Sequence, residues 1–234
     1  MICLVNYADH RMSRSQQVCS DSSLKYGVEK VHQLGPDDID REFWSLNREV
    51  LSMDRGAGYW LWKPYIVHRV MDTLRDGDIL IYADSGLYFI NDVKHIIGVM
   101  DQDVFLFTNG MAHEHWCKMD VIKAIIPDVS CGDQVQASVV FFRVSDESRR
   151  FVREWLRWCQ VPGFIDDSPS KVPNHPEFRE HRHDQAILTC LQIKYGYKLH
   201  WWADGHWFEN QRHRWPQDRY PAVIYHHRMR NDEW

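Results

Sequence analysis

The amino-acid sequence predicts an α/β fold, built on a mixed, mostly parallel β-sheet with helices on both faces. Two observations support this prediction. Short apolar runs alternate along the 234 residues with longer stretches whose apolar residues recur at helical spacing. The run at residues 78–83 is also too short and too rich in β-branched residues for a helix, and it is typical of a strand covered on both faces.

The chain begins with an apolar run at residues 2–7, which we expect to form a strand. A helix is predicted over residues 15–26, because Gly27 follows as a C-terminal cap. Residues 28–34 are predicted to form a second strand. A helix over residues 41–53 comes next, and its inner side is expected to carry Phe43, Leu46, Val50 and Leu51.

The segment of residues 56–86 combines a loop of glycines and aromatic residues, a helix, a turn and a strand. Pro64 suits the first turn of the helix, because its missing N–H would be unpaired there in any case. The apolar residues on one face of this helix are Ile66, Val67, Val70, Met71 and Leu74. After a turn at residues 76–77, the strand of residues 78–83 leads to Asp84. This places a carboxylate at the carboxyl end of the sheet, where open α/β folds bind their ligands.

The rest of the chain continues the alternation. Strands are expected at residues 103–107, 134–144 and 198–201, and helices at residues 93–100, 119–126 and 184–195. A further helix is capped at Ser145 and carries an apolar stripe that ends at Cys159. Residues 108–118 and 162–180 are expected to be loops, and the second has the length of a binding loop.

Length and composition indicate one globular domain over residues 1–234. A net charge of −5 without a long basic run argues against nucleic acid as a partner. The six cysteines include no Cys-x-x-Cys pair, which favours neither a zinc finger nor a disulfide framework and predicts a reducing compartment. Because the sequence shows no leader peptide and no apolar run of membrane-spanning length, we expect a cytoplasmic protein without a membrane span.

Two carboxylates stand at positions suited to chemistry. Asp84 is a hard oxygen ligand of the kind that Mg²⁺ or Mn²⁺ takes when phosphates fill the remaining positions, or alternatively it caps the turn that follows. Asp184 lies in the sequence HRHDQ at the start of a predicted helix. It either caps that helix, or it acts as a base or orients an acceptor hydroxyl. The neighbouring histidines lack further ligands at the spacing of a zinc site.

Further candidates lie near the two ends of the chain and before Pro64. A tyrosine at a strand end, Tyr7, can stack a base, Asp9 can accept a hydrogen bond from ribose or base, and Lys63 can neutralise phosphate. Of the two adjacent histidines near the carboxyl end, we expect His226 to point into a site, with Arg228 as a phosphate clamp. No glycine-rich dinucleotide or P-loop motif is present.

Taken together, these motifs resemble the glycosyltransferases of the A-type fold, the nucleotide-diphospho-sugar transferase superfamily. The specific similarity is to small bacterial, phage and algal-virus transferases that carry the same motifs in the same order. Here the motifs occupy residues 56–66, 77–86, 134–137, 181–185 and 226–228, so the resemblance spans almost the whole chain. It implies transfer of a sugar from a nucleotide-sugar donor, with a UDP-sugar favoured, to an acceptor hydroxyl on a glycan.

The resemblance also implies a role for each candidate. The family holds Mn²⁺ or Mg²⁺ through a DxD motif, of which this chain keeps only the last carboxylate, in Tyr82-Ala83-Asp84. The implied metal ligands are Asp84 and, by analogy, His226, and the catalytic residues are Asp184 and Gln185. The implied nucleotide-binding residues are Tyr7, Asp9, Lys63 and Tyr82. The implied substrate-binding residues are Trp60, Trp62, Gln136 and His183, and the acceptor is expected to meet Trp201, Trp202, His206 and Trp207.

Two other interpretations remain open. A carbohydrate-binding or inactive module of the same fold is motivated by the incomplete DxD motif and by the eleven tryptophans. A metal phosphohydrolase built on His183 and Asp184 would need an all-α bundle, and the predicted strands argue against it. The resemblance leaves open whether the anomeric centre is retained or inverted.

Overall fold

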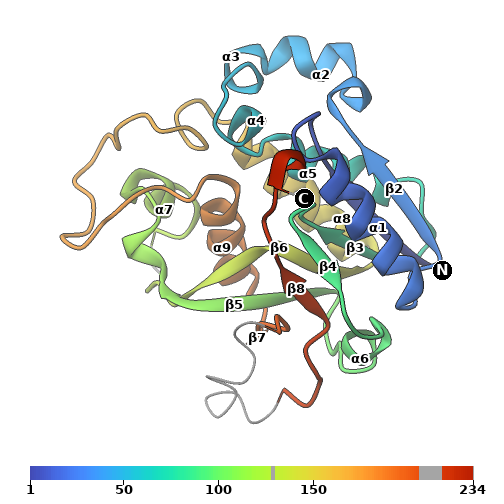
Figure 1. The fold of residues 1–234 in the computed structure, drawn as a ribbon. Helices are drawn as coiled ribbons and strands as arrows, with labels where there is room; N and C mark the ends of the chain where they lie inside the picture. Colours follow the sequence, from blue (N-terminus) through green and yellow to red (C-terminus); the bar gives the residue numbers. More distant parts are fainter. Residues whose placement is uncertain (128–129, 206–217, 234) are drawn as a thin grey trace.

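Six strands form one sheet, in the order β2-β1-β3-β6-β5-β7. Strand β6 runs antiparallel to both neighbours and the other five share one direction, so the prediction of a mixed, mostly parallel sheet is confirmed. The computed structural model describes residues 1–127, 130–205 and 218–233, and Figure 1 traces them. The strands are β1 Ile2–Tyr7, β2 Lys30–Leu34, β3 Ile79–Ala83, β5 Val104–Ala112, β6 Asp133–Arg143 and β7 Leu199–Trp201.

Helices cover both faces of the sheet, as predicted. Side chains of a strand point alternately to the two faces. Thus Val5 and Tyr7 belong to one apolar cluster, and Ile2 and Leu4 to the other. The first cluster receives side chains from α5 Trp62–Met71, α7 Met119–Ile125, α8 Asp146–Cys159 and α9 His183–Tyr195. The second receives them from α1 Ser13–Lys25 and α6 Lys94–Ile97.

The predicted helix over residues 41–53 is divided into two. It consists of α2 Arg41–Leu46 and α3 Arg48–Leu51, which lie together at the top of Figure 1. The break falls at Asn47, whose side-chain amide donates a hydrogen bond to the carbonyl of Phe43 at 2.8 Å and so competes with the backbone. The side chain of Leu46 next to this break is 75% exposed, so the prediction that Leu46 lies on the inner side of the helix was wrong.

The strand predicted at residues 103–107 continues further, because β5 follows the edge of β6 as far as Ala112. Two shifts of register interrupt this pairing after Leu106 and Thr108. A 3-10 turn, η2 His113–His115, comes next, so only residues 116–118 of the expected loop separate it from α7. Two further 3-10 turns in the described part of the chain are η1 Pro36–Asp38 and η4 Asn231–Glu233.

A second, two-stranded sheet brings the carboxyl-terminal segment beside the end of β3. It pairs β4 Leu87–Phe89 with β8 Ile224–His226 in antiparallel register, with Leu87 opposite His226. The carbonyl of Gly86 accepts backbone hydrogen bonds from His227 at 3.0 Å and Arg228 at 2.8 Å. A Cβ at Gly86 would lie 3.2 Å from Cα of Arg228. The glycine therefore permits the close approach that sets His226 near Asp84.

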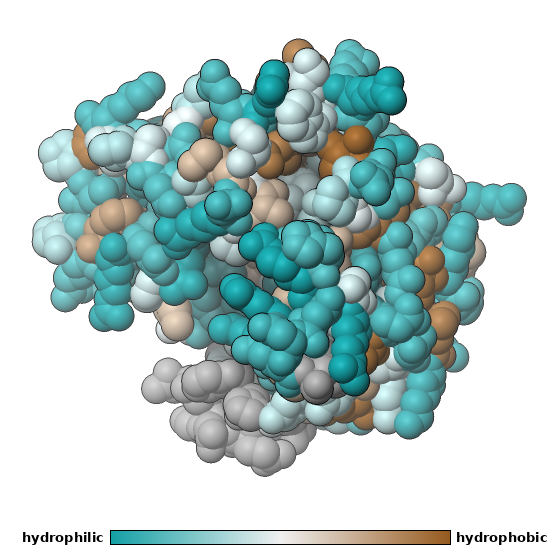
Figure 2. Space-filling view, turned by 45° about the horizontal axis from the view of Figure 1, so that its top comes forward, coloured by the Kyte–Doolittle hydropathy of each residue, from teal (hydrophilic) through white to brown (hydrophobic). Residues whose placement is uncertain are grey.

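Hydrophilic side chains cover most of the face of the molecule that Figure 2 shows. Large apolar side chains that are exposed come from scattered positions in the chain: Met1, Leu24, Trp44, Leu46, Met53, Val99 and Met111. Within the described ranges, no helix has the length and hydropathy needed to span a bilayer.

Candidate active site

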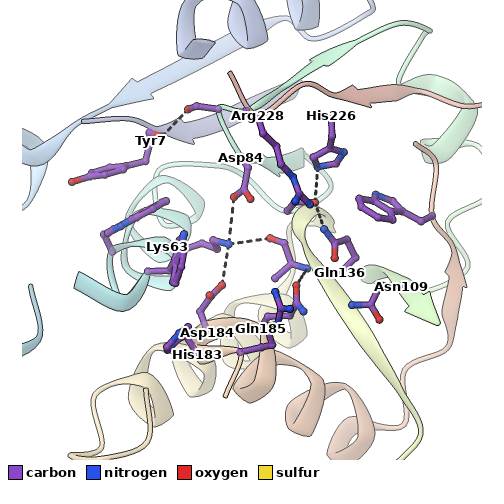
Figure 3. A pocket seen from close by; sticks show the side chains of 18 of the residues that line it. Tyr7, Lys63, Asp84, Asn109, Gln136, His183, Asp184, Gln185, His226 and Arg228 are labelled. Carbon is purple, nitrogen blue, oxygen red and sulfur yellow. Dashed lines mark hydrogen bonds and ion pairs between the residues drawn. The ribbon is translucent and has the colours of Figure 1, made fainter. Parts of the chain in front are cut away.

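A pocket of about 800 Å³ opens at the carboxyl ends of β1 and β3. Open α/β sheets bind ligands at this edge. The start of β6, the first turn of α9 and the end of β8 also contribute to the lining (Figure 3). The predicted site residues that line it are Tyr7, Trp60, Trp62, Lys63, Asp84, Gln136, His183, Asp184, Gln185 and His226. Asp9 and Tyr82 are not among the lining residues.

Lys63 lies at the centre of the charged groups. Its Nζ is 2.9 Å from Oδ2 of Asp184, 3.3 Å from Oδ1 of Asp84 and 3.2 Å from the carbonyl of Ala137. The residue is only 3% exposed. Burial lowers the pKa of Lys63, but Asp184 and Asp84 raise it by more, so the ammonium stays charged. In the structure the ammonium joins two carboxylates, and its contact with a phosphate stays a prediction.

Asp184 is in the first turn of α9 and is 4% exposed. Its backbone carbonyl accepts a hydrogen bond from the indole of Trp155 at 3.1 Å, which fixes this turn against α8. Burial raises the pKa of Asp184 to about 6, although Lys63 lowers it in part. The carboxylate can therefore gain or lose a proton close to neutral pH, as a group in acid–base chemistry must.

The buried side chain of Tyr82 contacts Asp84. The phenol donates a hydrogen bond to Oδ1 of Asp84 at 2.5 Å, and the Tyr82 ring lies 5.0 Å from Nζ of Lys63. Tyr82 is fully buried, which leaves it in contact with the charged groups and not with the open pocket. Asp9 lies apart from this cluster and pairs with Arg11 at 2.6 Å.

His226 is oriented by a buried carboxylate that the sequence did not reveal. Its Nδ1 lies 2.5 Å from Oδ2 of Asp204, which has no exposed surface, and its Nε2 lies 3.0 Å from the hydroxyl of Ser138. Metal-binding histidines commonly have such a carboxylate behind the ring. As expected, His226 faces the pocket, and the adjacent His227 does not line it.

The residues at this edge fit a divalent cation in the chemistry of their donors. Asp84 supplies a carboxylate whose Oδ2 has no hydrogen bond or ion pair to any other described residue, and His226 supplies an imidazole nitrogen. In the part of the chain that the structure describes, no group of three or more such ligands includes either residue. Phosphate oxygens and water would have to complete the coordination, as is usual for Mg²⁺.

Gln185 connects α9 to β6. Its side-chain carbonyl accepts a hydrogen bond from the backbone N–H of Ala137 at 3.2 Å, and its amide donates to the side chain of Gln134 at 2.8 Å. Gln136, on the same strand, donates to the hydroxyl of Ser138 at 2.8 Å. These bonds set the helix start that carries Asp184 against the strand that faces His226.

The aromatic side of the pocket is formed by a segment, residues 56–60, whose backbone has positive φ angles. Every residue from Gly56 to Trp60 has φ between 49° and 97°, so the turn labelled α4 Gly56–Tyr59 is left-handed. Such residues are strained unless they are glycine, and strain of this kind gathers at functional sites. The turn places the rings of Tyr59 and Trp60 at 5.1 and 5.2 Å from His183, which also has a positive φ, of 50°.

Trp62 stacks on Tyr7, with ring centroids 4.0 Å apart and planes at 17°. Both rings are mostly buried, so each contributes to the core as well as to the pocket wall. Trp201 and Trp202 line the opposite side. The other predicted acceptor residues, His206 and Trp207, lie outside the described residues.

Three arginines line the pocket: Arg55, Arg182 and Arg228. Arg228 was predicted as a phosphate clamp, and the other two were not predicted as site residues. Arg55 pairs with Asp167 at 3.1 Å and Glu180 at 3.2 Å, and Arg182 pairs with Glu180 at 2.9 Å. Asp167 and Glu180 belong to the long loop after α8, so these ion pairs dock that loop beside the left-handed turn. Single arginines in polar loops give no sequence signal that separates them from surface charge.

Three solved structures with a similar fold are glycosyltransferases. Mouse xyloside xylosyltransferase 1 has a TM-score of 0.50 at 10% identity, with 97% of each chain covered. The galactosyltransferase LgtC, in complex with donor and acceptor sugar analogues, has a TM-score of 0.55 at 15% identity, with 96% of this chain and 86% of that chain covered. The bifunctional glycosyltransferase WbbM has a TM-score of 0.56 at 12% identity, with 96% and 45% covered.

These similarities establish the fold class, which is the A-type glycosyltransferase fold that the sequence predicts. No protein-family model and no curated protein sequence matches the chain.

Proposed function

We propose that this chain is a glycosyltransferase, with residues 1–234 as one catalytic domain. It would transfer a sugar from a nucleotide-sugar donor, with a UDP-sugar favoured, to a hydroxyl group of a glycan. The observation that carries this proposal is the buried Lys63 shared by Asp84 and Asp184 in a large pocket at the carboxyl edge of the sheet. The fold supports it, and so does LgtC, which binds donor and acceptor sugar analogues.

The donor end of the pocket is proposed to lie between Asp84 and the end of β8. Asp84 and His226 would hold Mn²⁺ or Mg²⁺, which when bound supplies positive charge to the departing diphosphate. Arg228 lines the same end with an exposed side chain and can pair with a phosphate. Tyr7, at the end of β1, would stack a base, and Trp62 packs against its ring with the ring centroids 4.0 Å apart.

Asp184 is the proposed catalytic carboxylate. It is buried at the pocket wall, and its ionised form predominates above a pH of about 6. In an inverting reaction it would take the proton of the acceptor hydroxyl, and in a retaining reaction it would stabilise the positive charge at the sugar carbon. Lys63 keeps the carboxylate charged and in place, and Gln185 fixes the start of α9 behind it.

The acceptor is proposed to bind on the aromatic side, against Trp60, with His183 behind that ring. Flat aromatic faces suit the apolar faces of sugar rings. The pocket extends from there to Trp202 and Gln136, so a glycan chain has room along the edge of the sheet.

A second candidate is a binding module of the same fold that lacks turnover. It is favoured by one observation: the single carboxylate kept from the DxD motif, Asp84, already pairs with an ammonium and a phenol. Such a protein would bind a nucleotide-sugar and leave it intact.

One experiment separates the two candidates. Purified protein is incubated with Mn²⁺ and a panel of UDP-, GDP- and CMP-sugars, and release of the nucleotide is measured beside the Asp184→Asn variant. The enzyme is expected to hydrolyse one donor. The variant is expected to bind that donor and to hydrolyse it at a rate that is roughly 10²- to 10⁴-fold lower. Donor binding without turnover in the unsubstituted protein would favour the module.

A further inference from the structure

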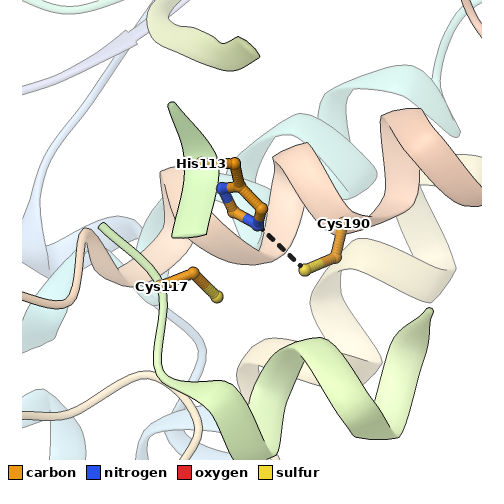
Figure 4. Close-up of side chains that lie close together, drawn as sticks. All are labelled: His113, Cys117 and Cys190. Carbon is orange, nitrogen blue, oxygen red and sulfur yellow. Dashed lines mark hydrogen bonds between the residues drawn. The ribbon is translucent and has the colours of Figure 1, made fainter. Parts of the chain in front are cut away.

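A buried group of three metal-binding side chains lies apart from the pocket. It consists of His113 in η2, Cys117 before α7 and Cys190 in α9 (Figure 4). Their ligand atoms all lie within 4.8 Å of one another, and Nε2 of His113 is 3.3 Å from Sγ of Cys190. All three residues are 0% exposed, and both cysteines are free.

The chemistry of this group suits zinc. Zn²⁺ binds thiolates at about 2.3 Å and imidazole nitrogens at about 2.0 Å, so ligands around one ion lie about 4 Å apart. The three ligand atoms here lie within 4.8 Å of one another, and small side-chain movements would bring them to that spacing. Two thiolates and a neutral imidazole exactly balance the charge of the ion, which matters because an uncompensated charge in a buried position is costly. Soft sulfur ligands also select against Mg²⁺ and Ca²⁺.

We propose that His113, Cys117 and Cys190 bind a zinc ion that has a structural role. Binding would replace the two thiol protons, which leave to solvent, by two zinc–sulfur bonds and one zinc–nitrogen bond. The three side chains would occupy three of the four tetrahedral positions that zinc prefers.

Such an ion would join segments that are distant in the chain. His113 and Cys190 are separated by 77 positions, and the ion would tie the end of β5 to the middle of α9. The N–H of Lys118, next to Cys117, donates to Nδ1 of His181 at 3.2 Å, just before α9 begins. The helix that carries Asp184 would thus be fixed at its start and near its centre.

Among the residues that the structure describes, two other places offer metal ligands, and neither contains sulfur. Glu114, His115 and His175 form a partly exposed group beside the buried one, and Asp84 and His226 lie in the pocket. A thiolate signal therefore identifies the buried group alone. Cobalt(II) gives this signal, because thiolate ligands add an intense charge-transfer band to its spectrum.

The test begins with the unsubstituted full chain, purified under reducing conditions. We expect about one zinc ion per chain, and a thiolate-to-cobalt band after the zinc is exchanged for Co²⁺. Chelation is expected to lower the unfolding temperature by roughly 4 °C or more. A reduced chain that holds no zinc and gives no thiolate band with Co²⁺ overturns the proposal, as does a Cys117–Cys190 disulfide found under these conditions.

Variants then assign the ligands. Cys117→Ser and Cys190→Ser are expected to lose the zinc and the cobalt band. Two variants serve as controls. Cys159→Ser removes an equally buried thiol outside the group, and His175→Ala removes a ligand of the neighbouring, partly exposed group. Both control variants are expected to keep the zinc and the cobalt band. Retention of the band in both ligand variants contradicts the proposal. If a ligand variant does not fold, the measurements on the unsubstituted chain still decide it.

Discussion

Oδ2 of Asp184 lies 2.9 Å from Nζ of Lys63, although one residue begins α9 and the other lies in the first turn of α5. Asp84 shares the same ammonium from the end of β3. With all three groups ionised the cluster carries one net negative charge, in a place where neither Lys63 nor Asp184 is screened by water. The first two predictions follow from this arrangement of charges.

Replacing Lys63 by methionine is expected to destabilise the protein, because two carboxylates lose their buried partner. The loss should be about 3 kcal/mol at pH 8. It should be smaller at pH 5, because Asp184, whose pKa is already raised to about 6, can take up a proton. Urea unfolding at both pH values measures the difference, with Lys118→Met, at a buried lysine outside the pocket, as the control. An equal loss at both pH values would show that Asp184 does not respond.

Asp184 should also make the stability of the unsubstituted protein depend on pH. Its pKa is about 6 in the folded chain against an ordinary value of 3.8, so between these values the folded state binds more protons than the unfolded state. The contribution of Asp184 to stability is complete below pH 3.8 and is lost as the pH rises through about 6. Relative to Asp184→Asn, the free energy of unfolding is therefore expected to fall over this interval, by roughly 1 to 3 kcal/mol. Parallel curves for the two proteins would contradict the assignment.

Asp84→Ala is expected to abolish the part of donor binding that depends on a divalent cation. Calorimetric titration of the nucleotide-sugar with Mn²⁺ and with a chelator measures that part. Asp76→Ala serves as the control, because Asp76 is exposed and lies before the start of β3, whereas Asp84 follows its end. This variant should bind the nucleotide-sugar with the affinity of the unsubstituted chain. Donor affinity that stays the same in Asp84→Ala would refute a metal role for this carboxylate.

Asp204→Asn is expected to weaken cation binding by about 10- to 100-fold, because the amide orients His226 less firmly and makes its ring less basic. The matched control is Asp218→Asn, since Asp218 forms a similar buried pair with His200 at 2.9 Å, outside the pocket lining. Manganese affinity, followed by electron paramagnetic resonance, is the measurement. Equal effects of both substitutions would leave only a structural role for Asp204.

Gly58→Ala is expected to destabilise the chain by roughly 2 kcal/mol or more. The residue has a φ of 97°, and an added Cβ would lie 2.7 Å from Cα of Leu51, a backbone atom that cannot turn aside. Gly77→Ala provides a control, because Gly77 also has a positive φ, of 87°, but an added Cβ meets nothing within 4 Å. The unfolding temperature of Gly77→Ala should fall by a smaller amount. If the two fall equally, the contact with Leu51 does not matter.

Much of the fold could be predicted because buried residues of a helix or strand recur in the sequence with the period of that element. The strand at residues 78–83 and the helix that ends at Cys159 were located from that pattern, and both are present. The break at Asn47 was missed, because a side-chain hydrogen bond to the preceding turn leaves no change in hydrophobic period. The extension of β5 to Ala112 was missed too, since its last residues are polar or exposed and show no apolar alternation.

Residues of the pocket could be predicted where a carboxylate lies at the end of a strand or in the first turn of a helix. Asp84 follows a strand and Asp184 begins a helix, and the fold brings both to Lys63. Contacts between segments distant in the sequence left no such signal. Nothing near Asp204 indicates that it supports His226, and Cys190 has no companion cysteine at a metal-binding spacing. These partners depend on the tertiary fold.

The pairing of β8 with β4 gives the pocket an order of assembly. Synthesis proceeds from the amino terminus, so Lys63, Asp84 and Asp184 have all left the ribosome before Ile224 is made. His226 and Arg228 then arrive last, when β8 docks against β4 and Gly86. A nascent chain thus carries the lysine and both carboxylates without the imidazole that the proposed cation needs. Cation-supported donor binding would begin only once β8 has docked.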